Sequence, residues 1–190
     1  LIGWAHCPNA MATSKTGSFW LTERVNMATV GTLASGTIDL GAYVDVGDQQ
    51  AISIEQVDWI TQGRDSANNP QLITDALAAN TTFGYQLSDL NPGGVMLWAD
   101  DQSLVASGTL GVDFGDRIFT HSADFYPDTF GKLDQARMVV NDQLYVTAVA
   151  SGGYGANESV DVSVRIKARI VKLSTKDWMA IAIQSTAADN

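Results

Sequence analysis

The sequence predicts an all-β protein: a jelly-roll-type antiparallel β-sandwich of about eight strands, with an N-terminal arm, one inserted short helix and a short C-terminal helix. Two observations predict this fold class. Several segments alternate apolar and polar residues with a period of two, and turn-forming residues separate them at irregular intervals. The sequence also lacks βαβ alternation, heptads and internal repeats, so long crossovers between two sheets favour a jelly roll over an immunoglobulin-type sandwich.

The composition fits one β-rich domain with an extensive contact surface. A chain of 190 residues is long enough to bury a proper core. Asp outnumbers Glu by 18 to 3, and Asp suits turns because its side chain bonds nearby backbone amides. Charged residues make up only 17 % of the chain, which suggests that part of the surface faces other protein. The single cysteine, Cys7, excludes an internal disulfide, and no apolar run approaches the roughly 20 residues of a transmembrane helix.

Residues 1–30 are predicted to form an extended arm ahead of the sandwich. Trp4, Phe19 and Trp20 lie among Ala, Thr, Ser and Gly, and they follow neither the strand period nor the helix period. Rings without periodicity usually dock into pockets, either on their own domain or on a neighbour's. The chain begins with Leu1 and without the basic segment of a signal peptide, which leaves proteolytic processing open.

The sandwich is predicted to span residues 31–174, and it opens with two strands. Residues 38–46 alternate apolar and polar side chains, Gly47-Asp48 supplies a turn, and residues 51–60 form a return strand. The apolar side chains change face part-way along this return strand. That change predicts a β-bulge near Glu55-Gln56, or a strand that is buried on both sides.

A short helix and three further strands are predicted next. Residues 70–79 form the helix, because Pro70 suits the first helical turn. The strands follow over residues 83–87, 95–98 and 104–114. Gly115 to Asp134 is then a long irregular loop rich in aromatic residues, and loops of that length usually form interfaces or functional sites.

The last strands lead into a C-terminal helix. Residues 136–140 and 143–150 carry a short hairpin signal where they join. The strand that follows alternates over residues 160–170 and ends at Ser174. Ser174 and Asp177 have the spacing of a helix-capping box, so residues 175–190 are predicted to form a helix and a tail. One face of that helix carries Trp178, Ile181 and Ala182.

Positive charge is concentrated on the last strand and just beyond it. Five of the eleven cations lie there without an intervening acid, while the remaining six stand against all 21 acids: Arg165, Lys167, Arg169, Lys172 and Lys176. Three of the five share one strand face and repel each other unless something negative lies opposite. An acidic neighbouring strand, the acidic surface of another subunit or an external polyanion would satisfy them. Nucleic acid is disfavoured, because the rest of the chain would repel it.

The sequence carries no catalytic or metal-binding signature, and we expect neither enzyme activity nor a metal or other cofactor. The adjacent pair His6-Cys7 would point to opposite faces of a strand. His121 lies among Asp116, Asp124 and Asp128, a set that could form a calcium site or an oriented base but more simply forms a solvated loop. Neither a nucleophile elbow of the form G-x-S-x-G nor a phosphate-binding glycine loop occurs.

A carbohydrate-binding, lectin-like β-sandwich is the alternative function. The aromatic residues available for a sugar platform are Trp59, Trp98, Tyr126 and Tyr154. Their spacing does not separate this role from core packing. A glycosidase needs two carboxyls that face each other across a cleft, whereas the neighbours Asp100 and Asp101 more simply solvate a turn. Glycosylation sequons at Asn80 and Asn157 would matter only on a secretory route.

The arm, about eight strands, an inserted helix and the ending "VDVSVRIKARIVKLSTKDWMAIAI" resemble the single jelly-roll major capsid proteins of icosahedral viruses. The chain is similar in particular to those of membrane-containing viruses of archaea and bacteria. The aromatic arm departs from the basic arms of capsid proteins that bind genome directly. That departure argues against direct, sequence-specific binding of nucleic acid.

The resemblance implies a structural virion protein, located in the virion, that self-assembles into a shell. Its partners would be copies of itself and other capsid proteins, and the cationic face would also suit an anionic membrane leaflet beneath the shell. We expect the subunit and partner contacts to involve aromatic residues of the arm and loop together with the cations of the last strand: Trp4, Phe19, Trp20, Phe125, Tyr126, Phe130, Arg165, Lys167, Arg169 and Lys172.

Overall fold

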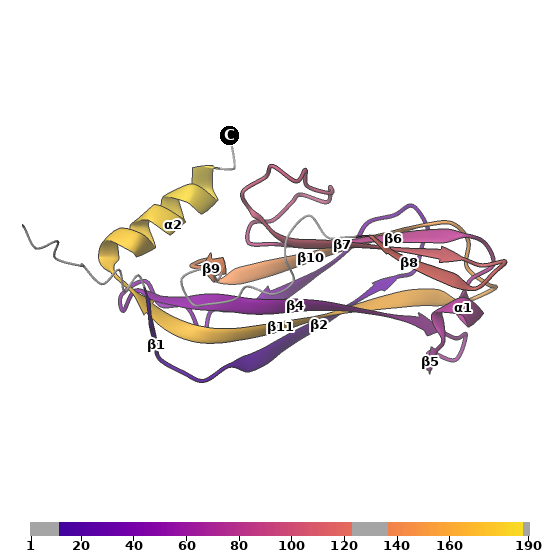
Figure 1. Cartoon of the computed structure of the whole chain (residues 1–190), viewed down its shortest axis with the longest axis horizontal. Coiled ribbons are helices and arrows are strands. Elements are labelled where there is room, and N and C mark those ends of the chain that lie inside the picture. Colours follow the sequence, from indigo (N-terminus) through magenta and orange to yellow (C-terminus); the bar gives the residue numbers. More distant parts are fainter. Residues whose placement is uncertain (1–11, 123–136, 188–190) are drawn as a thin grey trace, which may run out of the picture.

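The computed structural model describes residues 12–122 and 137–187, which form two antiparallel β-sheets packed face to face (Figure 1). The first sheet has six strands: β1 (Ala12–Ser14), β2 (Phe19–Met27), β4 (Gln50–Arg64), β5 (Pro70–Gln71), β9 (Arg137–Val139) and β11 (Ser159–Leu173). The second sheet has five: β3 (Ala34–Asp39), β6 (Thr81–Ser88), β7 (Leu104–Asp113), β8 (Ile118–Ser122) and β10 (Gln143–Ser151). Two helices complete the fold: α1 (Ile73–Ala76) and α2 (Thr175–Ala187). The predicted all-β sandwich is confirmed.

The strand order is that of a jelly roll. In the first sheet β2 pairs with β11, β11 with β4, and β4 with β9; in the second, β3 pairs with β10, β10 with β6, and β6 with β7. The chain changes sheet at six of its ten connections, and the steps β1–β2, β4–β5, β6–β7 and β7–β8 stay within one sheet. This repeated crossing winds eight strands into two four-stranded layers, to which the short strands and β8 are added.

The core lies between the two sheets and is completed by the apolar face of β11. That face is fully buried over five alternate residues: Val160, Val162, Val164, Ile166 and Ala168. Aromatic side chains from the facing strands fill the centre. Trp59 stacks on Tyr85 with ring centroids 5.4 Å apart, and the Tyr85 hydroxyl lies 2.6 Å from the Thr61 hydroxyl. Burial raises the pKa of Tyr85 far above its ordinary value.

The N-terminal segment differs from the predicted arm over residues 12–30. Residues 19–27 form β2, which pairs with β11 from Phe19 opposite Ala168 to Met27 opposite Val160. Val25 and Met27 belong to the core, and the Phe19 ring stacks on Tyr43 at 5.2 Å. The strand forms because the second half of this segment does alternate, and β11 offers it an open edge. Trp4 lies outside the described residues.

The predicted hairpin of residues 38–46 and 51–60 was wrong. The first strand ends at Asp39, where the side chain accepts a hydrogen bond from the Gly41 amide (2.8 Å) and starts a turn. β3 then belongs to the second sheet and β4 to the first, so the only pairing between the two segments is an isolated bridge from Asp45 to Gln50. The connection is therefore a crossover between sheets.

The predicted β-bulge in the return strand is confirmed. Lys167 of β11 lies opposite Gln56, whereas the next residue, Ala168, lies opposite Ile54. Glu55 is therefore the extra residue of β4. The shift lets Ile54 and Val57 both face the core, because the bulge resets the alternation between them.

Three shorter predictions were corrected by tertiary contacts. The helix over 70–79 is reduced to the four residues of α1. Residues 95–98 form no strand, because the Gln86 amide bonds the Leu97 backbone at both its nitrogen (2.7 Å) and its oxygen (2.8 Å). Residues 136–150 form no hairpin, since β9 pairs with β4 in one sheet and β10 with β3 and β6 in the other.

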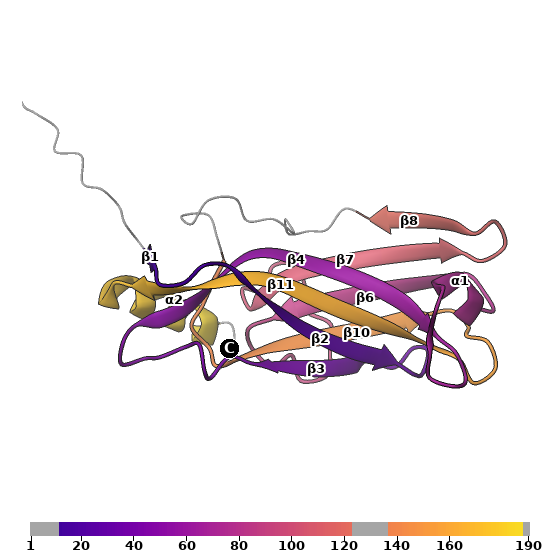
Figure 2. The ribbon, with the colours of Figure 1, turned by 90° about the horizontal axis from the view of Figure 1, so that it is seen from below.

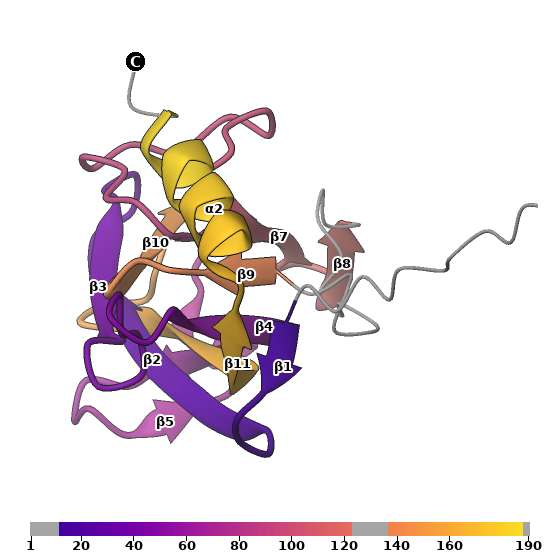
Figure 3. The ribbon, with the colours of Figure 1, turned by 90° about the vertical axis from the view of Figure 1, so that its left-hand side faces the viewer.

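The C-terminal helix agrees with its prediction. The Ser174 hydroxyl accepts a hydrogen bond from the Asp177 amide (3.2 Å) and donates one to its carboxylate (2.6 Å). The predicted apolar face packs on a second, smaller cluster at the ends of β4, β9 and β11: Ala51, Val140, Val171 and Leu173, against Trp178, Ile181 and Ala182. Figure 3 shows α2 at this end of the sandwich, beside β9. Within residues 12–122 and 137–187, neither helix has the length and apolar character needed to cross a membrane.

Candidate functional site on the outer face of the first sheet

The cationic side of β11 forms the middle of an outward-facing surface. Because Val164, Ile166 and Ala168 point into the core, the residues between them point away from it. β2 lies along one edge of β11 and β4 along the other, so three strands contribute to this surface (Figure 2). From Val160 to Ala168, the strand register sets each residue of β11 between β2 and β4. We call this surface the outer face; from β11 it contains Asp161, Ser163, Arg165, Lys167 and Arg169.

One end of the outer face is closed by a two-point ion pair. The Arg64 guanidinium donates to both carboxylate oxygens of Asp161, through Nε at 2.7 Å and Nη2 at 2.6 Å. The Asn26 amide donates to the same carboxylate at 3.2 Å. The hydrogen bond to Asp161 raises the pKa of Arg64. Asp161 is only 7 % exposed, so this arrangement is structural.

Arg169, toward the other end of the outer face, has its negative partner within the subunit. Its guanidinium forms an ion pair with Glu55, the extra residue of the bulge. Ser18 donates to the second oxygen of this carboxylate at 2.7 Å. An acidic residue on a neighbouring strand, one of the partners considered from the sequence, is therefore present, and it neutralises this one cation.

Arg165 and Lys167 differ from Arg169, because within the described residues neither makes an ion pair. The Arg165 guanidinium carbon lies 4.8 Å from the centre of the Trp20 ring, a cation–π contact between a side chain of β11 and one of β2. Asp58 lies opposite Arg165 in the register, but its carboxylate accepts a hydrogen bond from the Gln56 amide (2.8 Å) instead. Both charges on this part of the face thus remain available to a partner.

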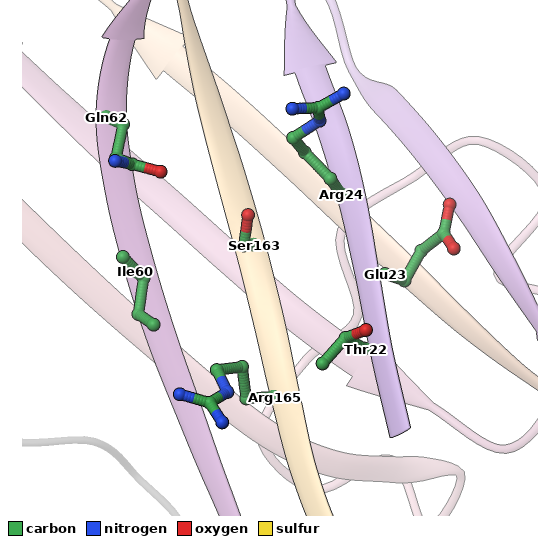
Figure 4. Close-up of a pocket in the computed structure, with 7 residues that line it drawn as sticks. All are labelled: Thr22, Glu23, Arg24, Ile60, Gln62, Ser163 and Arg165. Atoms are coloured by element: carbon green, nitrogen blue, oxygen red, sulfur yellow. The ribbon is translucent and has the colours of Figure 1, made fainter. Parts of the chain in front are cut away.

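A groove of about 470 Å³ crosses β11 at Ser163 (Figure 4). Ser163 lies between Arg24 of β2 and Ile60 of β4, and its small side chain leaves the space. Figure 4 shows the β2 and β4 side chains on either side of Ser163, with Arg165 at one end. The groove is lined by Thr22, Glu23, Arg24, Ile60, Gln62, Ser163 and Arg165. The lining contains two guanidinium groups, two hydroxyls, an amide and one carboxylate, that of Glu23, which points away from Ser163 and lies beside Gly36 of β3. The groups that remain at Ser163 include both guanidinium groups, which suits an anionic group.

The outer face brings together only part of the predicted contact set. Trp20, Arg165, Lys167 and Arg169 lie on it, whereas Phe19 is on the opposite face of β2 and Lys172 lies beyond it, opposite Gln50 and Thr13. The remaining predicted residues lie outside the described part of the chain: Trp4, Phe125, Tyr126 and Phe130. Sequence reasoning missed Arg24. The alternation of Trp20, Thr22, Arg24 and Asn26 was the available signal.

The described part of the chain contains no cluster of three or more His, Cys, Asp or Glu side chains that could hold a metal ion. The pair His6-Cys7 and the residues Asp124 and Asp128 lie outside it, as does the side chain of His121. The solvated loop expected there stays a prediction, and so does the calcium site considered as its alternative.

A second pocket, of about 270 Å³, lies on the outer side of the second sheet. Its floor includes Gly84, and its walls include Met96 and Trp98 from the loop between β6 and β7. Trp98 is 83 % exposed, so it is the aromatic residue of the predicted sugar platform that solvent reaches most freely among those described. Trp59 packs in the core, and burial raises the pKa of Tyr154 to about 12.

Two solved structures similar to this chain are VP1 proteins of polyomaviruses. VP1 of Trichodysplasia spinulosa-associated polyomavirus, in complex with sialylated precision glycooligomers, is 9 % identical, with 83 % of this chain and 96 % of that chain covered and a TM-score of 0.45. An unassembled VP1 pentamer of Washington University polyomavirus, in a mutant form, is also 9 % identical, with 84 % and 95 % covered and a TM-score of 0.40. No protein-family model matches the sequence, and no curated protein does. At these scores the likeness carries no weight for function.

Proposed function

We propose that the protein is a structural subunit of a virion, a capsid protein that self-assembles into a shell through contacts between its sheet faces, loops and edges. The proposal starts from the jelly-roll winding, which presents two broad sheet faces with loops at both ends. In such a subunit the function lies in the contacts between copies. The outer face and the surface of the second sheet are the candidate contact surfaces.

The observation that carries the proposal is the position of large exposed apolar side chains on the second sheet. Trp98 lies on the loop over this sheet and is 83 % exposed. Ile118 and Phe119 lie on its last strand, β8, and are 55 % and 50 % exposed. Ile118 and Phe119 are neighbours on a strand and point to opposite faces, so the three side chains are separate apolar groups that a contact between copies would cover.

The position of β8 adds a second reason. Within the described residues β8 pairs with β7 alone, so its other edge is the end of the sheet. An edge strand with apolar side chains is a template for pairing with another chain. A shell subunit uses such an edge, whereas a monomeric protein usually protects it.

Light scattering coupled to size-exclusion chromatography, followed by electron microscopy, tests the proposal. We expect oligomers or closed particles that grow with protein concentration. The variant Trp98→Ser with Phe119→Ser should lower the mass, whereas Val46→Ser, which removes a 64 % exposed side chain from the β3–β4 turn, should not. A wild-type protein that stays monomeric across salt, pH and concentration would contradict the proposal.

A carbohydrate-binding module is the second candidate, and the exposed Trp98 beside its pocket favours it. Aromatic faces that solvent can reach stack against the apolar face of sugar rings. The test is a glycan-binding screen that follows tryptophan fluorescence. Loss of binding in Trp98→Ala, with binding kept in Trp20→Ala, would support this function; binding unchanged in Trp98→Ala, or no binding to any glycan, would contradict it.

The outer face is the surface that would contact the predicted anionic membrane leaflet. Arg165 and Lys167, which make no ion pair with another described residue, fit an anionic leaflet, although the net charge of −10 opposes approach of the whole molecule. Sedimentation with vesicles that contain anionic lipid tests this contact. Retention that Arg165→Glu abolishes would support it, and no retention at low salt would contradict it.

A further inference from the structure

We propose that the groove at Ser163 receives the carboxylate of Asp100 from a second copy of this chain, so that the groove of one copy and the Trp98–Asp100 turn of the next form a repeated contact. This inference rests on the proposed function, because it assumes that copies associate. It goes further by naming the two surfaces that meet and the charges that hold them together.

The groove has two guanidinium groups to offer. Among the described residues, Lys15, Arg64, Arg137 and Arg169 make ion pairs within the subunit, but Arg24 and Arg165 do not. The register places Arg24 beside Ser163 and Arg165 two residues further along β11, so they are diagonal neighbours about 7–8 Å apart at the backbone. Guanidinium groups bind carboxylates through two parallel hydrogen bonds, which suits an acidic side chain better than a neutral one.

Glu23 is the acidic residue of the lining, and its carboxylate points away from Ser163 toward Gly36, so it does not face the bound carboxylate. Ser163, Thr22 and Gln62 add hydroxyl and amide groups that make no hydrogen bond through their side chains to other described residues. Ile60 forms an apolar part of the wall and is 39 % exposed. The groove therefore accepts a segment that carries one acid and one large apolar side chain.

A second copy of this chain is itself an acidic partner. Its net charge is −10, so an associating copy presents many more carboxylates than cations. Several acids on exposed turns already have local partners: Asp45, Asp65 and Asp113 accept backbone amides, and Asp48 pairs with Lys15. Asp116 is followed directly by Arg117, which would face the arginines of the groove.

Asp100 is an exposed acid that has no partner among the described residues and lies near a large apolar side chain. It is exposed, and no hydrogen bond or ion pair of its carboxylate is found among the described residues. It lies two residues after Trp98, the most exposed large apolar side chain of the described surface. The two hydrogen bonds between the Gln86 amide and the Leu97 backbone hold the turn over the second sheet, so it is presented in one position. This turn thus carries the acid and the apolar group that the groove accepts.

The two surfaces lie on different sides of the molecule. The groove is on the outer face of the first sheet, whereas the turn lies over the outer side of the second sheet. Figure 1 shows the loop between β6 and β7 rising above the second sheet, away from β2, β4 and β11. A contact between unlike surfaces is heterologous, so each copy keeps one free groove and one free turn and the association can continue.

Mixing two charge-reversed variants tests the contact. In Asp100→Arg an arginine would face the arginines of the groove, and in Arg165→Glu a glutamate would face Asp100. We expect each variant alone to associate about tenfold or more weakly than wild type, because like charges meet in every contact. In an equimolar mixture each variant can meet its complement, so association measured by light scattering should return toward the wild-type value.

Matched controls make the same charge changes elsewhere. Lys176→Glu lies on α2 and Asp75→Arg lies on α1, both away from the outer face and the groove; neither should weaken association. Arg165→Gln with Asp100→Asn repeats the test without introducing a new charge, and circular dichroism checks that each variant is folded. A mixture that associates no better than its components, or variants that assemble as wild type does, would overturn this contact while leaving the proposed function in place. Wild type that never associates would overturn both.

Discussion

Glu55 and Arg169 form an ion pair across the bulge in β4, although they lie 114 positions apart in the sequence. The bulge places Glu55 on the outer face by adding one residue to the strand. One cation of the charged strand is therefore neutralised within the subunit, while Arg165 and Lys167 have no acidic partner in residues 12–122 and 137–187. The cluster that looks uniform in the sequence divides into a structural residue and two residues available for contacts.

Arg169→Glu should lower the free energy of unfolding by about 1–3 kcal/mol, because it sets two carboxylates against each other where an ion pair was. Both side chains are partly shielded, at 32 % and 13 % exposed, so solvent screening reduces the loss. Lys167→Glu, the matched change at a residue that has no ion pair among those described, should alter stability by less than about 0.5 kcal/mol. Urea denaturation of the two variants measures the difference, and equal losses would show that the bulge pair is unimportant.

Asp161→Asn should destabilise the fold by about 2 kcal/mol, since it leaves the Arg64 guanidinium with a neutral acceptor in place of a carboxylate that takes two hydrogen bonds. A double-mutant cycle with Arg64→Met isolates the pair, and we expect a coupling free energy of about 1–2 kcal/mol. A coupling near zero in chemical denaturation would mean that Asp161 is stabilised mainly by Asn26.

Asp89 predicts a pH dependence of stability. Burial raises the pKa of its carboxyl above the ordinary 3.8, although Arg137, which donates at 3.1 Å, opposes the rise. The protonated Asp89 carboxyl is therefore favoured more in the folded state than in the unfolded chain. Its contribution to the free energy of unfolding is full below pH 3.8, and it is lost as pH rises through the raised pKa. Wild type should gain stability relative to Asp89→Asn as pH is lowered into this window.

Asp65 provides the control of opposite sign for that experiment. Hydrogen bonds from Asn69 and Ala67 lower the pKa of its carboxyl, so its contribution is present above the ordinary pKa of 3.8 and is lost as pH falls below it. Wild type should therefore lose stability relative to Asp65→Asn over acidic pH. Urea midpoints measured between neutral and acidic pH compare the two variants, and trends of the same sign would refute the assignment of Asp89.

Gly63→Ala should separate α1 from β4. A methyl group there would lie 2.7 Å from the Leu72 carbonyl oxygen and 2.8 Å from the Ala76 side chain, so the helix has to move. We expect a loss of about 1–3 kcal/mol. Gly17→Ala is the matched control, because no atom lies within 4 Å of the added methyl. Thermal denaturation gives both values, and an unchanged melting temperature in Gly63→Ala would show that α1 packs loosely.

The elements that could be predicted are those with a strong local signal. β11 and α2 follow from strict alternation and from a capping box, respectively, and the bulge follows from a change of face at Glu55. Pairing partners could not be predicted in the same way. The segments around Gly47-Asp48 and Asn141 read as hairpins because each joins two strands by a turn, but a jelly roll sends such strands to different sheets. Which sheet a strand joins depends on contacts far along the chain.

The candidate site was predicted in the same incomplete way. The alternation on β11 identified Arg165 and its neighbours as one face. The groove depends in addition on Arg24 and Ile60, which reach Ser163 only through the register of three strands. Residues 19–27 were assigned to an arm because the aromatic residues at the start of the segment obscured the alternation behind them.

The place of β11 in its sheet determines how a partner can reach its charges. β4 occupies one edge of β11 over nearly its whole length, and β1 and β2 occupy most of the other. Its backbone is therefore engaged, and no incoming strand can be added beside it. A partner must approach at right angles to the sheet and recognise side chains alone, so its affinity should fall steeply with ionic strength, unlike an association through the backbone of β8.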